Sequence, residues 1–190
     1  MKHVLILCCA VALLTACGSS GSSNTVAGGP TILPPAESEQ QWAQRIVDRF
    51  LRPLNTDLRV VNGLRDPQIV IYISNQNPTT LRIVRRALKD LERCQIKLVS
   101  IGPPPPQSGP FQRVNAKFKA ACAKYVPVAR TLQRAVVFWS SGRTDVIPRG
   151  FTLFRSTTRD ANSAGAQYVA GIRIAQNLPE FRRAGLKPSA

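Results

Sequence analysis

The sequence has a single histidine, His3, which stands next to the amino terminus. The rest of the chain therefore lacks an imidazole for a Ser-His or Cys-His nucleophile pair or for a metal site. The ten Asp and Glu residues are scattered singly, and Walker, Rossmann and Gly-x-Ser-x-Gly patterns are absent. A two-carboxylate site of the glycosidase kind stays open, although no spacing indicates one. We predict that the protein is not an enzyme and holds neither a metal nor a cofactor.

The amino terminus has the three zones of a secretory signal peptide. Lys2 supplies a positive charge, residues 4–14 form an unbroken apolar run, and the small residues Thr15 and Ala16 precede Cys17. A helix of this length spans about 16 Å, roughly half of a bilayer core. The run is therefore too short for a stable transmembrane anchor.

The residues that close this segment, Leu-Thr-Ala-Cys, resemble the lipobox of bacterial lipoproteins. In that family the cysteine becomes the acylated first residue of the mature protein, which implies lipidation of Cys17. The next three residues are not acidic, and in the enterobacterial pattern this implies sorting to the outer membrane, facing the periplasm. The alternative is an ordinary cleaved signal peptide with a chance cysteine.

Few cysteines are left for the mature protein. Cys8 and Cys9 leave with the signal peptide and Cys17 is taken by lipid, so that Cys94 and Cys122 remain. Two thiols in an oxidising compartment most simply form one disulfide. Such a bond would stabilise the domain by about 3 to 4 kcal/mol in the chain-entropy model. Two separate buried thiols are the alternative.

Acidic residues are scarce relative to basic ones. After cleavage, 25 Lys and Arg stand against 10 Asp and Glu, a net charge of +15. Such a charge attracts nucleic acid, lipopolysaccharide, phospholipid head groups or an acidic partner protein, whereas a merely solubilising surface is the alternative. The basic residues form no block and are not interleaved with aromatic residues, so the charge alone does not indicate nucleic acid.

Composition divides the chain into four parts. Residues 1–16 are predicted as the signal peptide, and residues 17–37, rich in Ser, Gly and Pro, as a flexible tether that begins with lipidated Cys17. Residues 38–184 are enough for a single domain with its own core, and residues 185–190 form a tail that we expect to fray. Inside the domain, residues 102–110 contain four consecutive prolines, which predict a stiff exposed loop.

The hydrophobic pattern of the domain predicts an α/β fold with a β-α-β core and flanking helices. Residues 68–74 and 96–101 are apolar, β-branched runs typical of central, parallel strands. Residues 80–93 between them have a helical apolar stripe, and residues 37–51 have another, which Pro53 is expected to end. Weaker patterns predict strands at 58–61 and 135–140 and helices at 114–124 and 160–176.

The candidate binding residues lie after the first predicted strand. The strand-turn-helix-strand pattern of residues 69–102 resembles the core of OmpA-like peptidoglycan-binding domains. In that family a turn aspartate and a helix arginine hold the diaminopimelate of the cell wall. Arg85 or Arg86 matches the arginine, while Asn75 and Asn77 stand where the family has the aspartate. The resemblance implies peptidoglycan binding, and a solvated basic helix face is the alternative.

More of the chain resembles the pilus-assembly lipoproteins of the CpaD type, which serve the Tad (Flp) pilus at the outer membrane. The likeness takes in the lipobox, the tether, the predicted α/β unit, a later cysteine and a closing pattern of Asp-x-x-x-Arg, Arg-Asp-Ala and a helical tyrosine. The closing residues are Asp145, Arg149, Arg159, Asp160, Ala161 and Tyr168. The family's usual Asn-Leu after the cysteine is absent. The resemblance implies secretin or pilus-assembly proteins as partners.

The main prediction is a non-enzymatic outer-membrane lipoprotein that acts as an assembly or docking component of an envelope apparatus, in pilus or secretion biogenesis. Besides the lipid on Cys17, an acidic partner would dock on Arg82, Arg85, Arg86 and Lys89. One alternative is a peptidoglycan-binding lipoprotein of OmpA-like type. Another is a lipoprotein that binds a polyanion, either DNA or lipopolysaccharide.

Overall fold

The computed structural model describes residues 38–187, and every regular element in this part is helical. The predicted α/β fold is therefore wrong. The predicted signal peptide, tether and lipidation site at Cys17 lie outside the described residues. The elements are α1 (Glu39–Arg45), the π-helix η1 (Ile46–Leu51), α2 (Arg52–Gly63), α3 (Pro67–Ser74), α4 (Pro78–Glu92), α5 (Cys94–Ser100), α6 (Gly109–Trp139), the 3-10 turn η2 (Thr144–Val146), α7 (Ile147–Ser156), α8 (Thr158–Gln176) and α9 (Pro179–Arg183).

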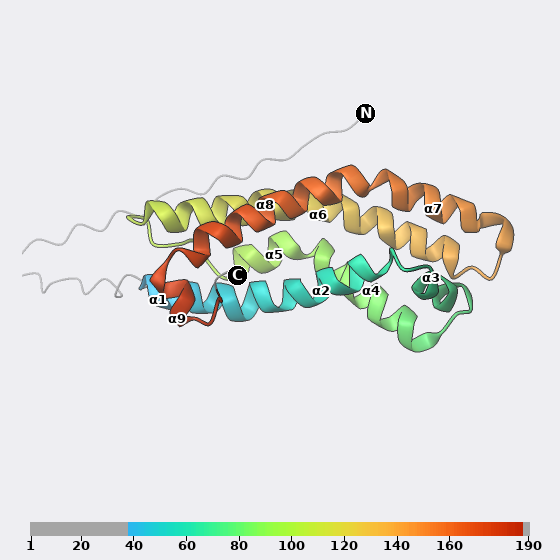
Figure 1. Ribbon diagram of the computed structural model, residues 1–190, viewed down its shortest axis with the longest axis horizontal. Helices are drawn as coiled ribbons and strands as arrows, with labels where there is room; N and C mark the ends of the chain where they lie inside the picture. Colours follow the sequence, from blue (N-terminus) through green and yellow to red (C-terminus); the bar gives the residue numbers. More distant parts are fainter. Residues whose placement is uncertain (1–37, 188–190) are drawn as a thin grey trace, which may run out of the picture. The chain divides into compact units, whose positions relative to one another are not determined.

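Residues 38–187 form a bundle of four antiparallel helical segments (Figure 1). The first segment is the run of α1, η1 and α2, the second is α4 followed by α5, the third is α6, and the fourth is α7 followed by α8. The long helix α6 is central to the packing, because it contacts α4, α5, α7 and α8. Helix α2 packs against α4, and α9 returns to α1.

The first predicted strand, residues 68–74, is the helix α3. Asp66 caps this helix, since its Oδ1 accepts a hydrogen bond from the Gln68 amide at 2.9 Å, and Pro67 occupies the first turn. Of the apolar run, Val70 and Ile73 are buried, one helical turn apart. Local capping and one-sided burial thus outweigh the strand propensity of the β-branched residues.

The second predicted strand, residues 96–101, is largely the helix α5. Its buried residues Cys94 and Leu98, followed by Ile101, recur at helical spacing and face the core. Ile96 and Val99 point the other way and are 69% and 67% exposed. The weaker strands predicted at 58–61 and 135–140 are also helical, within α2 and at the end of α6.

Pro53 does not end the first helical segment, contrary to the expectation from the sequence. The chain passes through η1 just before it, and the Arg52 amide donates to the Val47 carbonyl five residues earlier. A proline cannot donate the helical hydrogen bond, and its ring crowds the carbonyl four residues back. The wider π-turn therefore lets the helix continue from Ile46–Leu51 into α2.

The four prolines form a non-helical connection between α5 and α6, as predicted, although Pro104 is buried. Gln112 holds this connection by donating to the Pro104 and Pro105 carbonyls at 3.4 and 3.3 Å. The Trp42 indole donates to the Gly102 carbonyl at 3.2 Å, which ties the start of the loop to α1. The loop thus fixes where α6 begins.

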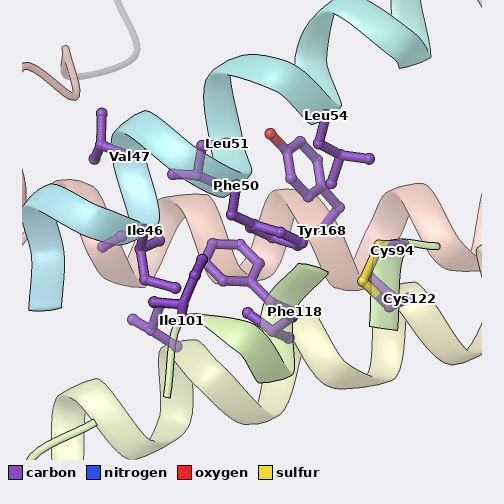
Figure 2. Packing of buried hydrophobic residues seen from close by; sticks show 14 of the residues in the cluster. Ile46, Val47, Phe50, Leu51, Leu54, Cys94, Ile101, Phe118, Cys122 and Tyr168 are labelled. Atoms are coloured by element: carbon purple, nitrogen blue, oxygen red, sulfur yellow. A yellow bond between two sulfur atoms is a disulfide. The ribbon is translucent and has the colours of Figure 1, made fainter. Parts of the chain in front are cut away.

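Aromatic side chains fill the centre of the bundle. Phe118 of α6 lies 5.5 Å from Phe50 of η1 and 5.9 Å from Tyr168 of α8, measured between ring centroids. Figure 2 shows these rings together, with the disulfide of Cys94 and Cys122 beside them. The Cα atoms of the two cysteines are 5.3 Å apart, and the bond that the sequence predicts joins α5 to α6.

Candidate docking surface

The solvent-facing side of α4 presents a row of cations. Arg82, Arg85, Arg86 and Lys89 follow one another at three- and four-residue steps, and all four are exposed. The opposite side of the helix is buried in the core through Val84, Ala87, Leu88 and Leu91. The apolar stripe therefore turns the predicted basic residues outward together.

Helix α6 lies antiparallel beside α4 and adds two cations to the same side. Glu92 of α4 accepts hydrogen bonds from the Arg130 Nε at 2.8 Å and the Gln133 Nε2 at 3.1 Å. Near the other end of the contact, Arg85 donates to the Ser140 hydroxyl at 3.4 Å. Arg130 and Arg134 are one turn apart on the exposed side of α6.

We call the exposed cations of these two helices the basic face. Arg93, the residue that caps the carboxyl end of α4, is one turn beyond Lys89 and is also exposed. The face comprises Arg82, Arg85, Arg86, Lys89, Arg93, Arg130 and Arg134.

Two carboxylates on α4 offset part of this charge. The hydrogen bonds from Arg130 and Gln133 hold the pKa of Glu92 below its ordinary value. Asp90 is shared between Lys97 at 3.0 Å and Arg86 at 3.8 Å. The other members of the face have no ion-pair partner within residues 38–187; these are Arg82, Arg85, Lys89, Arg93 and Arg134. A net positive field remains over the two helices.

Exposed apolar side chains accompany the basic face. Val137, 62% exposed, lies on α6 between Gln133 and Ser140, the two positions that bond to α4. Ile96 and Val99 project from α5, which continues the second helical segment after α4. Helix α5 packs against η1 of the first segment and against α6. These three are the most exposed large apolar side chains of the described residues. Cations with interspersed apolar groups are typical of a surface that docks a partner.

The two predicted asparagines do not join this surface. Asn77 caps α4, because its Oδ1 accepts a hydrogen bond from the Thr80 amide at 3.0 Å. Asn75 ends α3 and lines a separate hollow between α3 and α7. The groups beside Arg82 and Arg85 are instead Gln76 and Ser140. The asparagine-arginine pocket that the OmpA-like resemblance implies is therefore not assembled.

Sequence reasoning missed the cations that α6 contributes and the nearby Arg93. A signal for them was present, because residues 93–144 contain nine Lys or Arg and no Asp or Glu. A stretch without acids cannot neutralise its own cations. Its position against the row on α4 depends on tertiary packing, which the charge count does not reveal.

Comparison of the chain with family models, curated proteins and solved structures gives no match. Within residues 38–187, no three His, Cys, Asp or Glu side chains gather as metal ligands would. In the same range, no helix combines the length and apolarity that crossing a membrane requires. The basic face and its exposed apolar neighbours present charge and contact area on α4, α5 and α6.

Proposed function

We propose that the protein is a non-enzymatic docking component of an envelope assembly, anchored by lipid on Cys17 and facing the periplasm from the outer membrane. The basic face would bind an acidic protein of a pilus or secretion apparatus, with the Tad-type pilus as the leading candidate. The observation that carries this proposal is the joining of two cation rows by antiparallel packing of α4 and α6.

The composition of the face favours a protein partner over a nucleic acid. Protein surfaces that bind single-stranded nucleic acid combine cations with aromatic side chains on which the bases stack. The exposed apolar groups here are aliphatic, namely Ile96, Val99 and Val137. Aliphatic groups between cations suit a protein surface that carries carboxylates around an apolar patch.

Charge reversal on the basic face tests this proposal. One variant of the full chain carries Arg82→Glu, Arg85→Glu, Lys89→Glu and Arg134→Glu. Its control carries Arg155→Glu, Arg159→Glu, Arg173→Glu and Arg182→Glu, which are exposed arginines of α7, α8 and α9. Both variants change the net charge equally, so that general electrostatic attraction is matched.

Each tagged variant is purified from the native envelope with its bound proteins. We expect a partner that co-purifies with the unmodified chain and with the control to be lost from the basic-face variant. Equal recovery with both variants would contradict docking through this face. Recovery of cell-wall fragments instead, resistant to high salt, would support the peptidoglycan alternative, because screening removes non-specific attraction.

In the polyanion alternative, the same cations bind DNA or lipopolysaccharide. The salt dependence of binding distinguishes this alternative from docking of a protein. Binding of DNA is accompanied by release of condensed counterions, so affinity falls steeply and log-linearly with salt. Titration of the purified chain with DNA and with lipopolysaccharide at several salt concentrations measures that slope. Tight binding to either one that the basic-face variant loses and the control keeps would favour this alternative.

A further inference from the structure

A cavity of about 520 Å³ lies between α2 and α8, over a floor made by α6 and α4. Leu58 and Val61 of α2, Val128 and Leu132 of α6 and Phe154 of α7 supply its apolar walls. The volume is in the range of roughly 300–1,000 Å³ that small-molecule sites occupy. It is distinct from the basic face, because the exposed cations of α4 and α6 do not line it.

The cavity exists because α8 has little side-chain volume where it passes α2. Ala161 and Gly165 face the hollow, and a Cβ added to Gly165 would meet only the Tyr125 hydroxyl, at 4.0 Å. One hydrogen bond, from the Tyr168 hydroxyl to Asn55 Oδ1 at 2.8 Å, joins α8 to α2 beyond the hollow.

Tyr125 brings a hydrogen-bonding group into the cavity. Its side chain is buried, with 5% of the residue exposed, yet its hydroxyl has no hydrogen-bond partner in the described part of the chain. Burial raises the pKa of Tyr125 to about 12, so the hydroxyl keeps its proton at neutral pH. The hydroxyl is therefore a donor that an acceptor atom of a ligand, or a water, can reach inside the cavity.

The opposite end of the cavity is polar and positively charged. Arg65 lies there, beyond Asn62 of α2, and Asn162 faces them from α8. Arg65 is exposed and has no acidic partner within residues 38–187. From Leu58 to Gly63, the last residue of α2, the helix rises about 8 Å, and Arg65 lies two residues beyond that end, so the hollow is on the order of 10 Å long.

We propose that this cavity binds a small anionic amphiphile. Its carboxylate or phosphate pairs with Arg65, its apolar body fills the space against Leu58 and Val128, and an acceptor atom or a water at its far end meets the Tyr125 hydroxyl. An aliphatic chain of about 10 Å with one charged end matches the order of these groups along the helices.

Decanoate, 10-hydroxydecanoate and the uncharged decanol are the probes. Binding is measured by calorimetry at neutral pH on residues 18–190, which are the predicted mature chain without the lipidated Cys17, with the disulfide intact, and located by amide chemical shifts. We expect saturable decanoate binding with shifts at Leu58, Val61 and Gly165. Decanol should bind about five-fold or more weakly, because it lacks the charge that faces Arg65.

Three variants make the test specific to the cavity. Gly165→Leu fills the hollow, and we expect it to abolish binding without lowering the melting temperature, since the added side chain enters open space. Tyr125→Phe should weaken binding of 10-hydroxydecanoate about five-fold, the equivalent of one ordinary hydrogen bond, and leave binding of decanoate, which ends in a methyl group, unaffected. Arg65→Gln should remove the preference of the protein for decanoate over decanol.

Unchanged binding in the folded Gly165→Leu variant would overturn the proposal, as would the absence of saturable decanoate binding to the unmodified chain. Binding of anionic vesicles that Gly165→Leu leaves intact, without binding of free decanoate, would assign lipid attraction to the surface charge and would equally overturn it. These outcomes are independent of partner docking on the basic face, which none of the three variants touches.

Discussion

Phe118 of α6 lies directly against the backbone of α8 at Gly171. A Cβ added to Gly171 would stand 2.6 Å from the ring Cε1, closer than real Cβ contacts come. The same ring packs against Phe50 of the first helical segment. The absence of a side chain at Gly171 therefore sets how closely α6 and α8 approach across the core.

Gly171→Ala is expected to destabilise the protein by about 1–3 kcal/mol, the usual cost of forcing an extra methyl group into a packed core. Gly165→Ala is the matched control on the same helix, because its Cβ enters open space. It should raise the free energy of unfolding by up to about 1 kcal/mol, since alanine favours a helix more than glycine does. Urea unfolding of both variants measures the difference, and similar values for the two would contradict the packing described.

The disulfide should contribute about 3 to 4 kcal/mol to stability in the chain-entropy model. Cys94 and Cys122 are 28 residues apart in sequence, and both are buried. The double variant Cys94→Ala with Cys122→Ala should therefore unfold at markedly lower urea concentration. A reducing agent should lower the stability of the unmodified chain and leave the double variant unaffected. Equal stability of the two chains without reductant would speak against the bond.

Replacement of Asn77 by alanine is expected to lower the stability of the protein more than replacement of Asn75. Asn77→Ala removes the cap of α4 and should cost about 1 kcal/mol of stability. Asn75→Ala removes an exposed side chain for which no hydrogen bond to the described residues is seen, and it should change stability by less than about 0.5 kcal/mol. Denaturant titration distinguishes the two. Loss of stability at Asn75 alone would show that the roles are reversed.

Asp57 makes stability depend on pH. Burial raises its pKa to about 6, with Asp90 adding to the rise and the Lys97 ammonium, 3.8 Å away, opposing it. The folded protein therefore keeps a proton that the unfolded chain releases near 3.8, and stability falls as pH rises from about 4 to 6.

Asp57→Asn should remove this dependence, because the amide does not titrate. At pH 8 the variant should be more stable than the unmodified chain by about 1–2 kcal/mol, and at pH 4 the advantage should vanish. Unfolding of both chains at the two pH values gives the comparison. A variant that is less stable at pH 8 would mean that the charged Asp57–Lys97 pair contributes more than its burial costs.

The sequence predicts a helix correctly where its apolar residues recur with a clear helical periodicity. The stripe of Leu81, Val84, Leu88 and Leu91 identifies α4 and its outward cations, because polar and apolar residues separate at helical spacing. The apolar runs at 68–74 and 96–101 are ambiguous, since a short run without polar interruptions fits a buried strand or a helix equally. There the deciding signals were local: the Asp66-Pro67 start of α3 and the spacing of Cys94 and Leu98 in α5.

The candidate site also has one part that the sequence predicts and another part that it does not. The row on α4 follows from its own sequence, whereas its union with Arg130 and Arg134 depends on the antiparallel contact of Glu92 and Ser140 with residues distant in the chain. The cavity beside Tyr125 depends on two helices that flank it without filling it. Both features depend on packing between helices that are distant in the chain, and no periodicity in a single sequence predicts such packing.

Site-specific crosslinking in the native envelope tests the docking account most directly. A photo-crosslinking benzoylphenylalanine replaces Val137, which lies between the two cation rows, or in a control Val169 on α8, which is 46% exposed. The account predicts that light joins the chain to one acidic envelope protein from position 137 and not from position 169. Adducts from both positions alike, or from position 169 alone, would contradict docking through the basic face.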